Sequence, residues 1–415
     1  MEMKRVVVTG LGTINPIGNS VPEYWANLEK GVSGSEMITS FDASKFKTKF
    51  ACQVKNFDPN AYFDRKELKK IDPYTQFALV AVDEAMKDSG LNTEAIDLDM
   101  AGVVWASGIG GMQTFTEELR GYFAGDGTPR FSPYFIPRMI SDIAAGYISI
   151  KYGFRGPNFS TVSACASSTN GIISALDIIR TGKANVIIAG GSEASVNEVG
   201  VGGFNSMQAM STNNDEYKTA SRPFDVTRDG FVIGEGGGCI ILEEYEHAKA
   251  RGAKIYCELK GGGMSADAYH LTAPHPEGLG ARKVMENALK DADLTIQDID
   301  YINVHGTATP LGDIAEAKAI ISVFGDYAFK LNISSTKSMT GHLLGAAGAI
   351  EAIAAIFAIC TDTIPPTINF KSPDPEIDSR LNITPNSAQK RSVKAALSNT
   401  FGFGGHNASI IFQKI

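Results

Sequence analysis

The chain has 415 residues, of which 43% are hydrophobic and 20% charged, so it can bury a large core and is not a disordered polymer. Its formal charge of −8 argues against nucleic acid as the main partner, because binding phosphates needs a basic face. The five cysteines are scattered and form no CxxC pair, a pattern typical of a reducing compartment without disulfides or a zinc finger.

The predicted elements alternate between strands and helices. The first is residues 5–9 (RVVVT), a β-branched run typical of a strand buried on both faces. Further strands are predicted at residues 101–105, 185–189, 238–242, 301–304 and 408–412. Helices are predicted at residues 24–30, 73–89, 168–181 and 346–360. This alternation predicts an α/β architecture in which helices cover sheets.

No predicted segment indicates a membrane or an export signal. The most apolar helix, residues 346–360, is shorter than a membrane span and carries Glu351, so we expect it to be buried in the core. The first ten residues end in glycine and lack the apolar core of a signal peptide. We therefore expect a cytoplasmic protein.

A weak internal repeat suggests two halves. Residues 160–163 (STVS) precede one helix rich in small residues, and residues 335–338 (STKS) precede another, at an offset of 175 (335 minus 160). A four-residue match arises easily by chance, so the residues alone leave duplication open. The Lys/Glu-rich stretch 243–254 is the best boundary. We divide the chain into residues 1–250 and 251–415 and expect the two parts to pack as one body.

Gly10-Leu11-Gly12 follows the first strand and invites comparison with a dinucleotide-binding fingerprint. That fingerprint, G-x-G-x-x-G, needs a glycine where this chain has Asn15, and Gly18 comes too late. We interpret the two glycines as a tight strand-to-helix turn. A nicotinamide-dependent oxidoreductase is therefore disfavoured.

Cys165 is the candidate nucleophile. It directly precedes the apolar periodicity of the helix at 168–181, so it lies near a helix N-terminus, where the dipole and free N–H groups stabilise a thiolate or an oxyanion. Its small, polar neighbours leave room for a substrate. The alternative is a buried, inert thiol, the usual fate of a free cysteine, and the residues leave both open. We expect that inert state for the other four cysteines: Cys52, Cys239, Cys257 and Cys360.

Two histidines stand where α/β folds place functional groups. His305 follows a strand end in NVHGTATPLGD, and His342 precedes a helix in STKSMTGHLLGAAG. No second histidine or carboxylate falls at a ligand spacing such as HxxxH, so we expect no metal site. Residues 398–407 (SNTFGFGGHN) are interpreted as a Gly-rich loop that can swing the ring of Phe401; the alternative is a plain turn before the last strand.

With Cys165, His305, Lys337, His342 and Phe401 in view, the chain resembles the β-ketoacyl-acyl-carrier-protein synthases, and among them the elongating, synthase II type of bacterial fatty-acid synthesis. The resemblance covers essentially the whole chain, from VVVTGLGTINPIGN through RPFDVTRDGFVIGEGGG and STKSMTGHLLGAAGAIEAI to SNTFGFGGHNAS. It implies a thiolase-like fold, in which duplicated α/β halves form a five-layered αβαβα core, and a homodimer. The implied reaction extends an acyl chain by two carbons in a decarboxylative condensation with a malonyl thioester, without a cofactor.

The resemblance also implies roles for single residues. Cys165 matches the acylated nucleophile, His305 and His342 the pair that drives malonyl decarboxylation, Lys337 the lysine beside them, and Phe401 the gating phenylalanine. The backbone N–H groups of Cys165 and Phe401 match the oxyanion hole.

Further positions match substrate-binding and orienting groups. Thr307 and Thr309 match groups that bind the pantetheine arm, while Ile109 and, more loosely, Phe204 match the acyl pocket. The acidic residues expected to orient the lysine and histidines are Asp313, Glu316 and Glu351. This chain departs from many relatives next to the nucleophile, because it has Ser167-Ser168 where they carry a glycine nearby. The departure leaves the preferred length of the acyl chain open.

The implied partner is an acidic acyl carrier protein, so we expect a basic docking patch despite the net negative charge. The densest basic cluster, which lies where the family docks its carrier, is Arg65, Lys66, Lys69 and Lys70. A second cluster is Lys45, Lys47 and Lys49.

Three alternatives share parts of this pattern. A polyketide or aryl-polyene ketosynthase would use the same chemistry on a different chain. A non-catalytic chain-length partner is disfavoured because such proteins usually lose the cysteine that is present here as Cys165. A degradative thiolase is disfavoured because the final Gly-rich segment carries no second cysteine.

Overall fold

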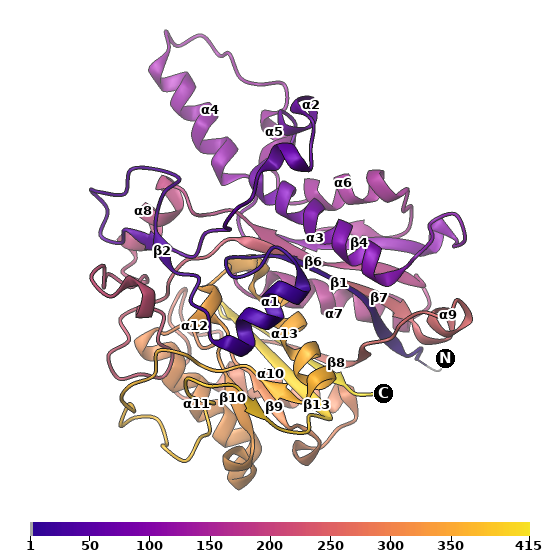
Figure 1. Ribbon diagram of the computed structural model, residues 1–415, viewed down its shortest axis with the longest axis vertical. Helices are drawn as coiled ribbons and strands as arrows, with labels where there is room; N and C mark the ends of the chain where they lie inside the picture. The colour runs from indigo at the N-terminus through magenta and orange to yellow at the C-terminus, as the bar shows by residue number, and fades with distance from the viewer. Residues whose placement is uncertain (1–2) are drawn as a thin grey trace.

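Ten strands form the framework of the computed structural model, which describes residues 3–415 (Figure 1). The strand order is β10-β9-β13-β14-β8-β1-β7-β6-β4-β5. The N-terminal strands are β1 (Val6–Ile14), β4 (Ala101–Ala106), β5 (Asn158–Phe159), β6 (Val186–Glu193) and β7 (Gly236–Glu244). The C-terminal strands are β8 (Cys257–Ala266), β9 (Tyr301–Asn303), β10 (Asn332–Ser334), β13 (Ala395–Gly402) and β14 (His406–Gln413). Among residues 3–415, the two groups of five strands pair with each other only where Val7 and Val8 of β1 meet β8.

The two groups share one pairing pattern, which is the structural sign of a duplication. β4 pairs in parallel with β5 and β6, and β7 pairs antiparallel with β6 and β1. In the same way, β9 pairs in parallel with β10 and β13, and β14 pairs antiparallel with β13 and β8. The short repeats at residues 160–163 and 335–338 directly follow the equivalent strands β5 and β10. The predicted duplicated halves are therefore confirmed.

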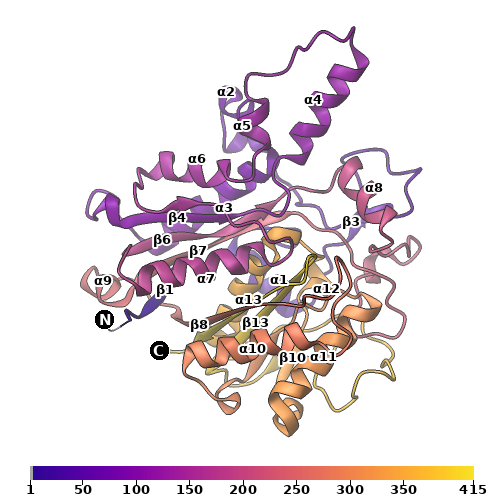
Figure 2. The same cartoon turned by 180° about the vertical axis from the view of Figure 1, so that it is seen from behind.

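Helices complete five layers (Figures 1 and 2). One outer layer, α3 (Pro73–Ser89) and α6 (Ile143–Tyr152), covers the N-terminal strands, and the other, α10 (Leu279–Ala292) and α11 (Pro310–Phe324), covers the C-terminal strands. Between the sheets lie α7 (Ser167–Arg180) and α13 (Ala347–Thr361), which contact strands of both halves. This αβαβα layering is the predicted thiolase-like fold.

The central position of α13 explains its composition. Because sheets cover it on both sides, twelve of its fifteen residues are buried, and they are mostly alanine and isoleucine. The segment from Leu344 to Thr361 is long and apolar enough to cross a membrane, but 83% of it is buried inside the protein. It is therefore a core helix, as predicted.

The glycines of β1 correct one sequence-based interpretation. Gly10 and Gly12 lie within the strand and not in a strand-to-helix turn, because α3 packs directly on them. A Cβ on Gly10 would lie 2.4 Å from the carbonyl oxygen of Ala85, and one on Gly12 would lie 2.0 Å from that of Ala81. The two glycines permit close helix–strand packing, so the predicted turn is wrong.

Near the end of the chain, too, residues that were predicted to lie outside a strand belong to one. Residues 398–402, expected in a Gly-rich loop, belong to β13, which forms a hairpin with β14. Only residues 403–405 turn the chain, and Gly404 and Gly405 there have φ values of +88° and +75°. Phe401 therefore lies near the end of a strand and not in a long loop.

Candidate functional site

Cys165 lies on a strained turn between β5 and α7. Ala164 has φ +49°, a value that residues with a side chain rarely adopt. Ser167 holds the turn, because its Oγ donates to the Ala164 carbonyl at 2.6 Å and accepts from the backbone N–H of Ser163 at 2.9 Å. The turn places Cys165 at the start of α7, as the sequence indicated, and leaves it only 7% exposed.

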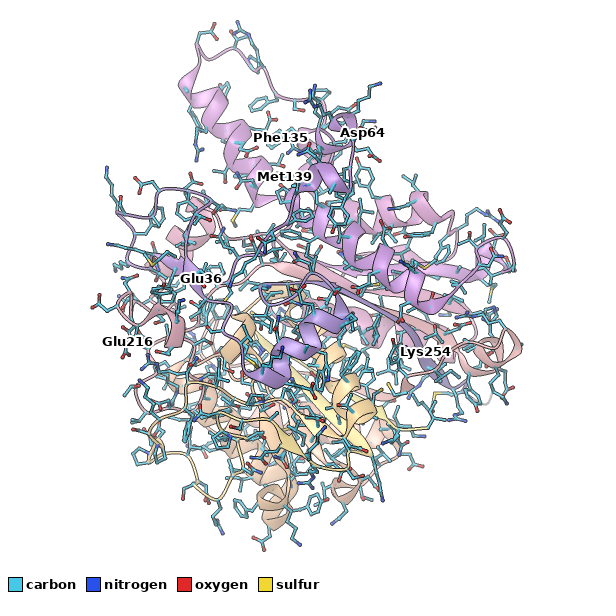
Figure 3. The ribbon with its side chains drawn as sticks, viewed as in Figure 1. Glu36, Asp64, Phe135, Met139, Glu216 and Lys254 are labelled. Atoms are coloured by element: carbon cyan, nitrogen blue, oxygen red, sulfur yellow. The ribbon has the colours of Figure 1, made fainter. Side chains whose placement is uncertain are left out.

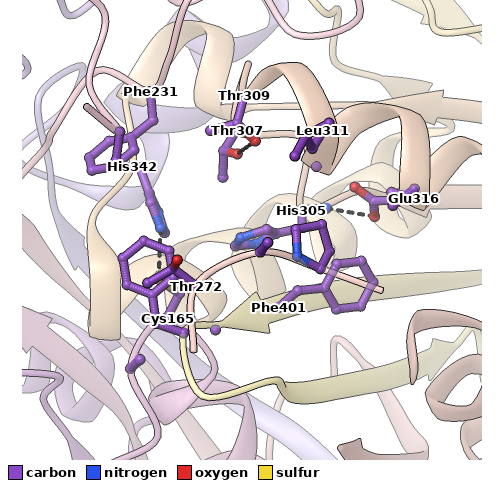
Figure 4. Close-up of a pocket in the computed structure, with 18 of the residues that line it drawn as sticks. Cys165, Phe231, Thr272, His305, Thr307, Thr309, Leu311, Glu316, His342 and Phe401 are labelled. Carbon is purple, nitrogen blue, oxygen red and sulfur yellow. Dashed lines mark hydrogen bonds between the residues drawn. The ribbon is translucent and has the colours of Figure 1, made fainter. Parts of the chain in front are cut away.

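Two histidines from the C-terminal half meet this cysteine (Figure 4). His342 Nε2 lies 3.0 Å from Cys165 Sγ. The rings of His305 and His342 are nearly perpendicular, at 88°, with centroids 5.3 Å apart. Phe401 lies against His305, with ring centroids 5.5 Å apart. Residues that are more than 130 positions apart in the chain therefore converge on one sulfur atom.

Burial decides the protonation state of these groups. Burial lowers the pKa values of both His305 and His342 well below the ordinary value, and the charge of Lys337 lowers them further. Both imidazoles are therefore neutral near pH 7, so each can accept one proton and donate one N–H.

The thiol differs from the sequence-based expectation of a thiolate. Burial raises the pKa of Cys165 to about 12, and the charge of Lys337 and backbone hydrogen bonds only partly oppose that rise. Desolvation disfavours the charged form, and here it outweighs the helix N-terminus. Before substrate binds, the cysteine is therefore a thiol with a neutral imidazole beside it.

Lys337 is the fixed positive charge of the site. Its ammonium group is buried and hydrogen-bonded to Glu351 Oε1 of α13. Burial raises the pKa of Glu351 to about 7, although Lys337 opposes the rise. The hydrogen bond places Glu351 where it can orient Lys337. The charge of Lys337 in turn acts on both histidines, whose pKa values it lowers.

Two carboxylates of α11 bind the backbone of the His305 loop. Glu316 accepts from the N–H groups of His305 and Gly306 at 2.9 and 2.8 Å. Asp313 accepts from the N–H groups of Phe224 and Ala308 at 2.8 and 3.2 Å. Glu316 therefore orients His305 through its main chain, whereas the hydrogen bonds of Asp313 hold the turn that follows.

That turn carries the two threonines expected to bind a pantetheine arm. Thr307 and Thr309 flank Ala308, which has φ +66°, and their Oγ1 atoms lie 3.1 Å apart (Figure 4). Arg228 fixes the turn from behind, because its Nε donates to the Thr309 carbonyl at 3.1 Å. The two hydroxyl groups therefore face the cavity from a rigid support.

A cavity of about 670 Å³ joins these groups, a size suited to a small-molecule substrate. Its lining includes Ile109 and Phe204, the two residues expected at an acyl pocket. Phe204 packs edge-on against Phe231, which packs edge-on against His342. Sequence reasoning missed Phe231, whose only signal was its place in the long RPFDVTRDGFVIGEGGG motif.

The four basic residues expected to dock a carrier do not line this cavity. They lie on α2 (Arg65–Leu68) and just after it, and three of them are exposed, while Lys70 is half-buried near the ring of Tyr134. Figure 3 shows Asp64, which caps α2, close to α5 (Phe135–Met139), at the end of the molecule from which α4 (Met112–Ala124) projects. Within one chain the structure does not bring this cluster to Cys165.

The remaining cysteines follow the expectation with one exception. Cys52, Cys239 and Cys257 are buried, as predicted, and the sulfur atoms of all five are free of disulfides. Cys360 is exposed near the C-terminal end of α13, so the prediction of burial is wrong there. The reason is that the helix emerges from between the sheets in its last turn.

Two family models match the chain over most of its length. Residues 3–248 match the N-terminal domain of β-ketoacyl synthase, and residues 256–371 match its C-terminal domain. The 3-oxoacyl-acyl-carrier-protein synthase 2 of Coxiella burnetii is 46% identical over 415 residues, which cover 100% of both chains. The protein of the same name from Staphylococcus aureus strain COL is 47% identical over 413 residues, which cover 100% of this chain and 99% of that one.

Solved structures agree over the whole chain. A ketosynthase of a type II polyketide synthase, in complex with its acyl-carrier protein and bound to the hexaketide, is 36% identical, with a TM-score of 0.91 and coverage of 100% of both chains. A β-ketoacyl synthase from Burkholderia phymatum STM815 is 34% identical, with a TM-score of 0.92 and the same coverage.

Proposed function

The chain belongs to the β-ketoacyl synthase family of condensing acyltransferases, and we propose that it extends acyl chains held on Cys165 with malonyl units in fatty-acid synthesis. In this role it is a 3-oxoacyl-acyl-carrier-protein synthase. The observation that carries the proposal is the contact of 3.0 Å between Cys165 and His342, beside His305, in a cavity of about 670 Å³. This combination supplies a nucleophile, a base and two N–H donors to one substrate.

The first half-reaction transfers the acyl chain to Cys165. As the sulfur attacks the thioester carbonyl, its proton passes to His342 Nε2, which lies 3.0 Å away and is neutral. The bond from the carbonyl carbon to the carrier sulfur breaks, and the carrier leaves as a thiol with that proton. We assign the oxyanion to the backbone N–H groups of Cys165 and Phe403, because both hydrogen-bond to the Cys165 sulfur and oppose the rise of its pKa. The second N–H group was expected from Phe401, and this assignment moves it two residues along the chain.

The second half-reaction uses both histidines as hydrogen-bond donors. The bond between the malonyl methylene and its carboxylate breaks, carbon dioxide leaves, and the electron pair forms an enolate. Neutral His305 donates one N–H to its oxygen, and neutral His342 donates a second from the tautomer that carries its proton on Nε2. The enolate carbon then attacks the Cys165 thioester, the carbon–sulfur bond breaks, and the released thiolate takes up one proton from solvent, which restores the thiol. The product is a 3-oxoacyl chain that is two carbons longer.

Lys337 contributes a fixed positive charge and exchanges no proton with the substrate. Its charge lowers the pKa values of both histidines and so keeps them neutral. Such a charge stabilises an anion by several kcal/mol only where water is excluded, and Lys337 is 1% exposed. We propose that Phe401, against His305, provides part of that exclusion as a gate.

The reaction itself tests this proposal. Carrier protein loaded with an acyl chain and carrier protein loaded with malonate, incubated together with the enzyme, should yield carbon dioxide and 3-oxoacyl product in equal amounts. Carbon dioxide release without a longer chain, or no reaction with any acyl donor, would contradict the proposed function. A polyketide ketosynthase remains the second candidate, since solved relatives at 34–36% identity include one, but the relatives at 46–47% carry the fatty-acid name.

In the pH profile of malonyl decarboxylation, the histidines should give no inflection near pH 6.5, their ordinary pKa. An inflection near pH 7 belongs to Glu351 and Glu316, whose pKa values burial raises to about 7. Both histidine pKa values are lowered, so the neutral forms persist as the pH falls through 6.5 and are lost only in more acidic solution. Lys337→Met should move this acid limb to higher pH, because the positive charge that lowers both values is gone. The measurement is kcat/KM of decarboxylation against pH, and an unmoved limb in the variant would contradict the role of Lys337.

We further propose that the carrier docks on the basic cluster of α2. The carrier bound to the solved polyketide ketosynthase supports a carrier partner here.

We also propose that the enzyme is a homodimer in the cytoplasm. β5 lies at the edge of the sheet with both residues exposed, and exposed Phe159 and Val162 favour pairing with a second copy. The free cysteines are consistent with a reducing compartment. We keep residues 1–250 and 251–415 as the nucleophile-bearing and histidine-bearing halves.

Changing both Lys69 and Lys70 to Glu should raise the apparent KM for carrier-bound substrate at least about tenfold, since two attractive charges become repulsive. Short thioester analogues, which do not use the patch, should react nearly as before. The same change at Lys45 and Lys47 tests the second basic cluster and should leave the apparent KM for carrier-bound substrate unchanged. Equal losses on both substrate types would contradict docking at α2.

A further inference from the structure

One buried carboxylate joins two loops at the wall of the cavity. Glu193 ends β6 and is fully buried. Its oxygens accept hydrogen bonds from the backbone N–H groups of Gly108 at 2.7 Å, Ile109 at 3.3 Å and Gly345 at 3.0 Å. A fourth comes from Ser107 Oγ at 3.1 Å. Three of the four donors are backbone N–H groups, so the carboxylate links the main chain of residues 108–109 to that of Gly345.

The two loops belong to different halves of the protein. Residues 107–109 follow β4, whereas Gly345 lies in the short helix η6 (Leu344–Ala346), just after His342. The loops meet so closely that a Cβ on Gly345 would lie 2.2 Å from the backbone nitrogen of Gly108. A Cβ on Gly108 would lie 2.8 Å from Glu193 Oε2. The contact therefore needs both glycines and the carboxylate between them.

The residues that Glu193 holds line the cavity, but Glu193 does not. Gly108, Ile109 and Leu344 belong to the lining, while Glu193 lies behind them. Burying a carboxylate is costly unless hydrogen bonds compensate, and here four hydrogen bonds converge on one group. Loss of any acceptor would leave buried N–H groups unpaired and free the loop to move. The position of the Ile109 side chain in the cavity depends on that loop.

We propose that Glu193 is a positioning residue for acyl-chain selectivity, which holds residues 107–109 against Gly345 and so sets the place of Ile109 in the acyl pocket. The inference rests on the proposed function, because it concerns the chain carried by Cys165. Glu193 does not touch the reacting atoms. It acts on the choice between acyl chains through Ile109. Its charge also raises the pKa of Cys165, an effect that is the same for every chain length.

Glu193→Gln tests this assignment. Glutamine has the same shape but replaces one acceptor oxygen by an NH₂ group, which faces N–H donors. The readout is the ratio of the rates at which hexanoyl and hexadecanoyl carrier protein acylate Cys165. We expect this ratio to change at least about tenfold, the lower end of the discrimination that a hydrophobic pocket provides. Malonyl decarboxylation, which does not use the acyl pocket, should stay within about twofold of wild type.

A second variant makes the test specific to Ile109. In an Ile109→Ala background there is no large side chain left to position, so adding Glu193→Gln should change the ratio less than about twofold. Glu84→Gln is the matched control, since Glu84 also accepts two backbone N–H groups, from Thr13 and Val21 at 2.8 Å each, away from the cavity. It should leave the ratio unchanged.

The outcomes separate the possible failures. An unchanged ratio, or equal losses in acylation and decarboxylation, would overturn the positioning role of Glu193. If Glu193→Gln does not fold, Ser107→Ala removes one of the four donors and should shift the ratio in the same direction; an unchanged ratio there would also overturn it. Failure of the proposed function looks different, because wild-type Cys165 would then take up neither chain.

Discussion

Cys165→Ala should abolish condensation, with a loss of at least about 10⁴-fold, because Cys165 is the one cysteine that lines the cavity in the described part of the chain. The variant should still decarboxylate malonyl carrier protein, since His305 and His342 bind the enolate without the sulfur. Release of carbon dioxide and formation of 3-oxoacyl product, measured together, check both parts. Loss of condensation with retention of decarboxylation is the informative result, because an unfolded protein would lose both reactions.

The exposed cysteine supplies the control for this experiment. Cys360→Ala removes the one thiol that is exposed among the five and should change neither reaction. Condensation by Cys165→Ala at more than a few per cent of the wild-type rate would contradict the nucleophile assignment. Loss of both activities in Cys360→Ala would show that cysteine replacement acts on the fold.

The second large effect should distinguish the two histidines. Only His342 contacts Cys165 Sγ, at 3.0 Å, whereas His305 lies beside it. His305→Ala should therefore slow decarboxylation about 10²- to 10⁴-fold and leave acylation of Cys165 within about tenfold of wild type. His342→Ala should slow both reactions, because it also removes the group that accepts the thiol proton.

Single-turnover acylation and decarboxylation rates measure this difference. The thermal unfolding midpoint of each variant accompanies them, since either change leaves a cavity in a buried site. Equal effects of the two substitutions on both reactions would contradict the assignment of the proton acceptor to His342 alone.

Much of the fold could be predicted where signals lie next to one another in the chain. The helix at 73–89 matches α3 to the residue because its boundaries are local: Asp72 caps it, Pro73 begins it and Gly90 ends it in the left-handed conformation. The positions of Cys165 and His342 at helix starts were likewise local features. The family resemblance then implied that the two meet, which periodicity alone does not indicate.

The wrong interpretations of secondary structure involve glycines whose partners lie far away in the chain. Gly10 and Gly12 look like a turn in the sequence, but they admit α3, whose position depends on the whole sheet. β8 was missed because it contains Gly261, Gly262 and Gly263, which lower strand propensity. Gly261 is required because α10 packs on it, and a Cβ there would lie 2.6 Å from Ala292 N.

Two features of the site could not be predicted because they depend on burial and on main-chain contacts. The helix start indicated a thiolate at Cys165, but the cost of desolvation raises its pKa, and no local signal gives that burial. Glu193 was missed for a related reason: its partners are backbone N–H groups, which every sequence contains. Only the fold brings Gly108 and Gly345 to the same carboxylate.

The measurement that tests the central claim most directly is the intact mass of the enzyme after mixing with long-chain acyl carrier protein and then with malonyl carrier protein. We predict a mass gain of one acyl chain that maps to Cys165, followed by its complete discharge to a 3-oxoacyl product when the malonyl carrier is added. If the acyl group appears on another residue, or if Cys165 stays unmodified with every acyl donor, the condensing mechanism proposed for this site is wrong.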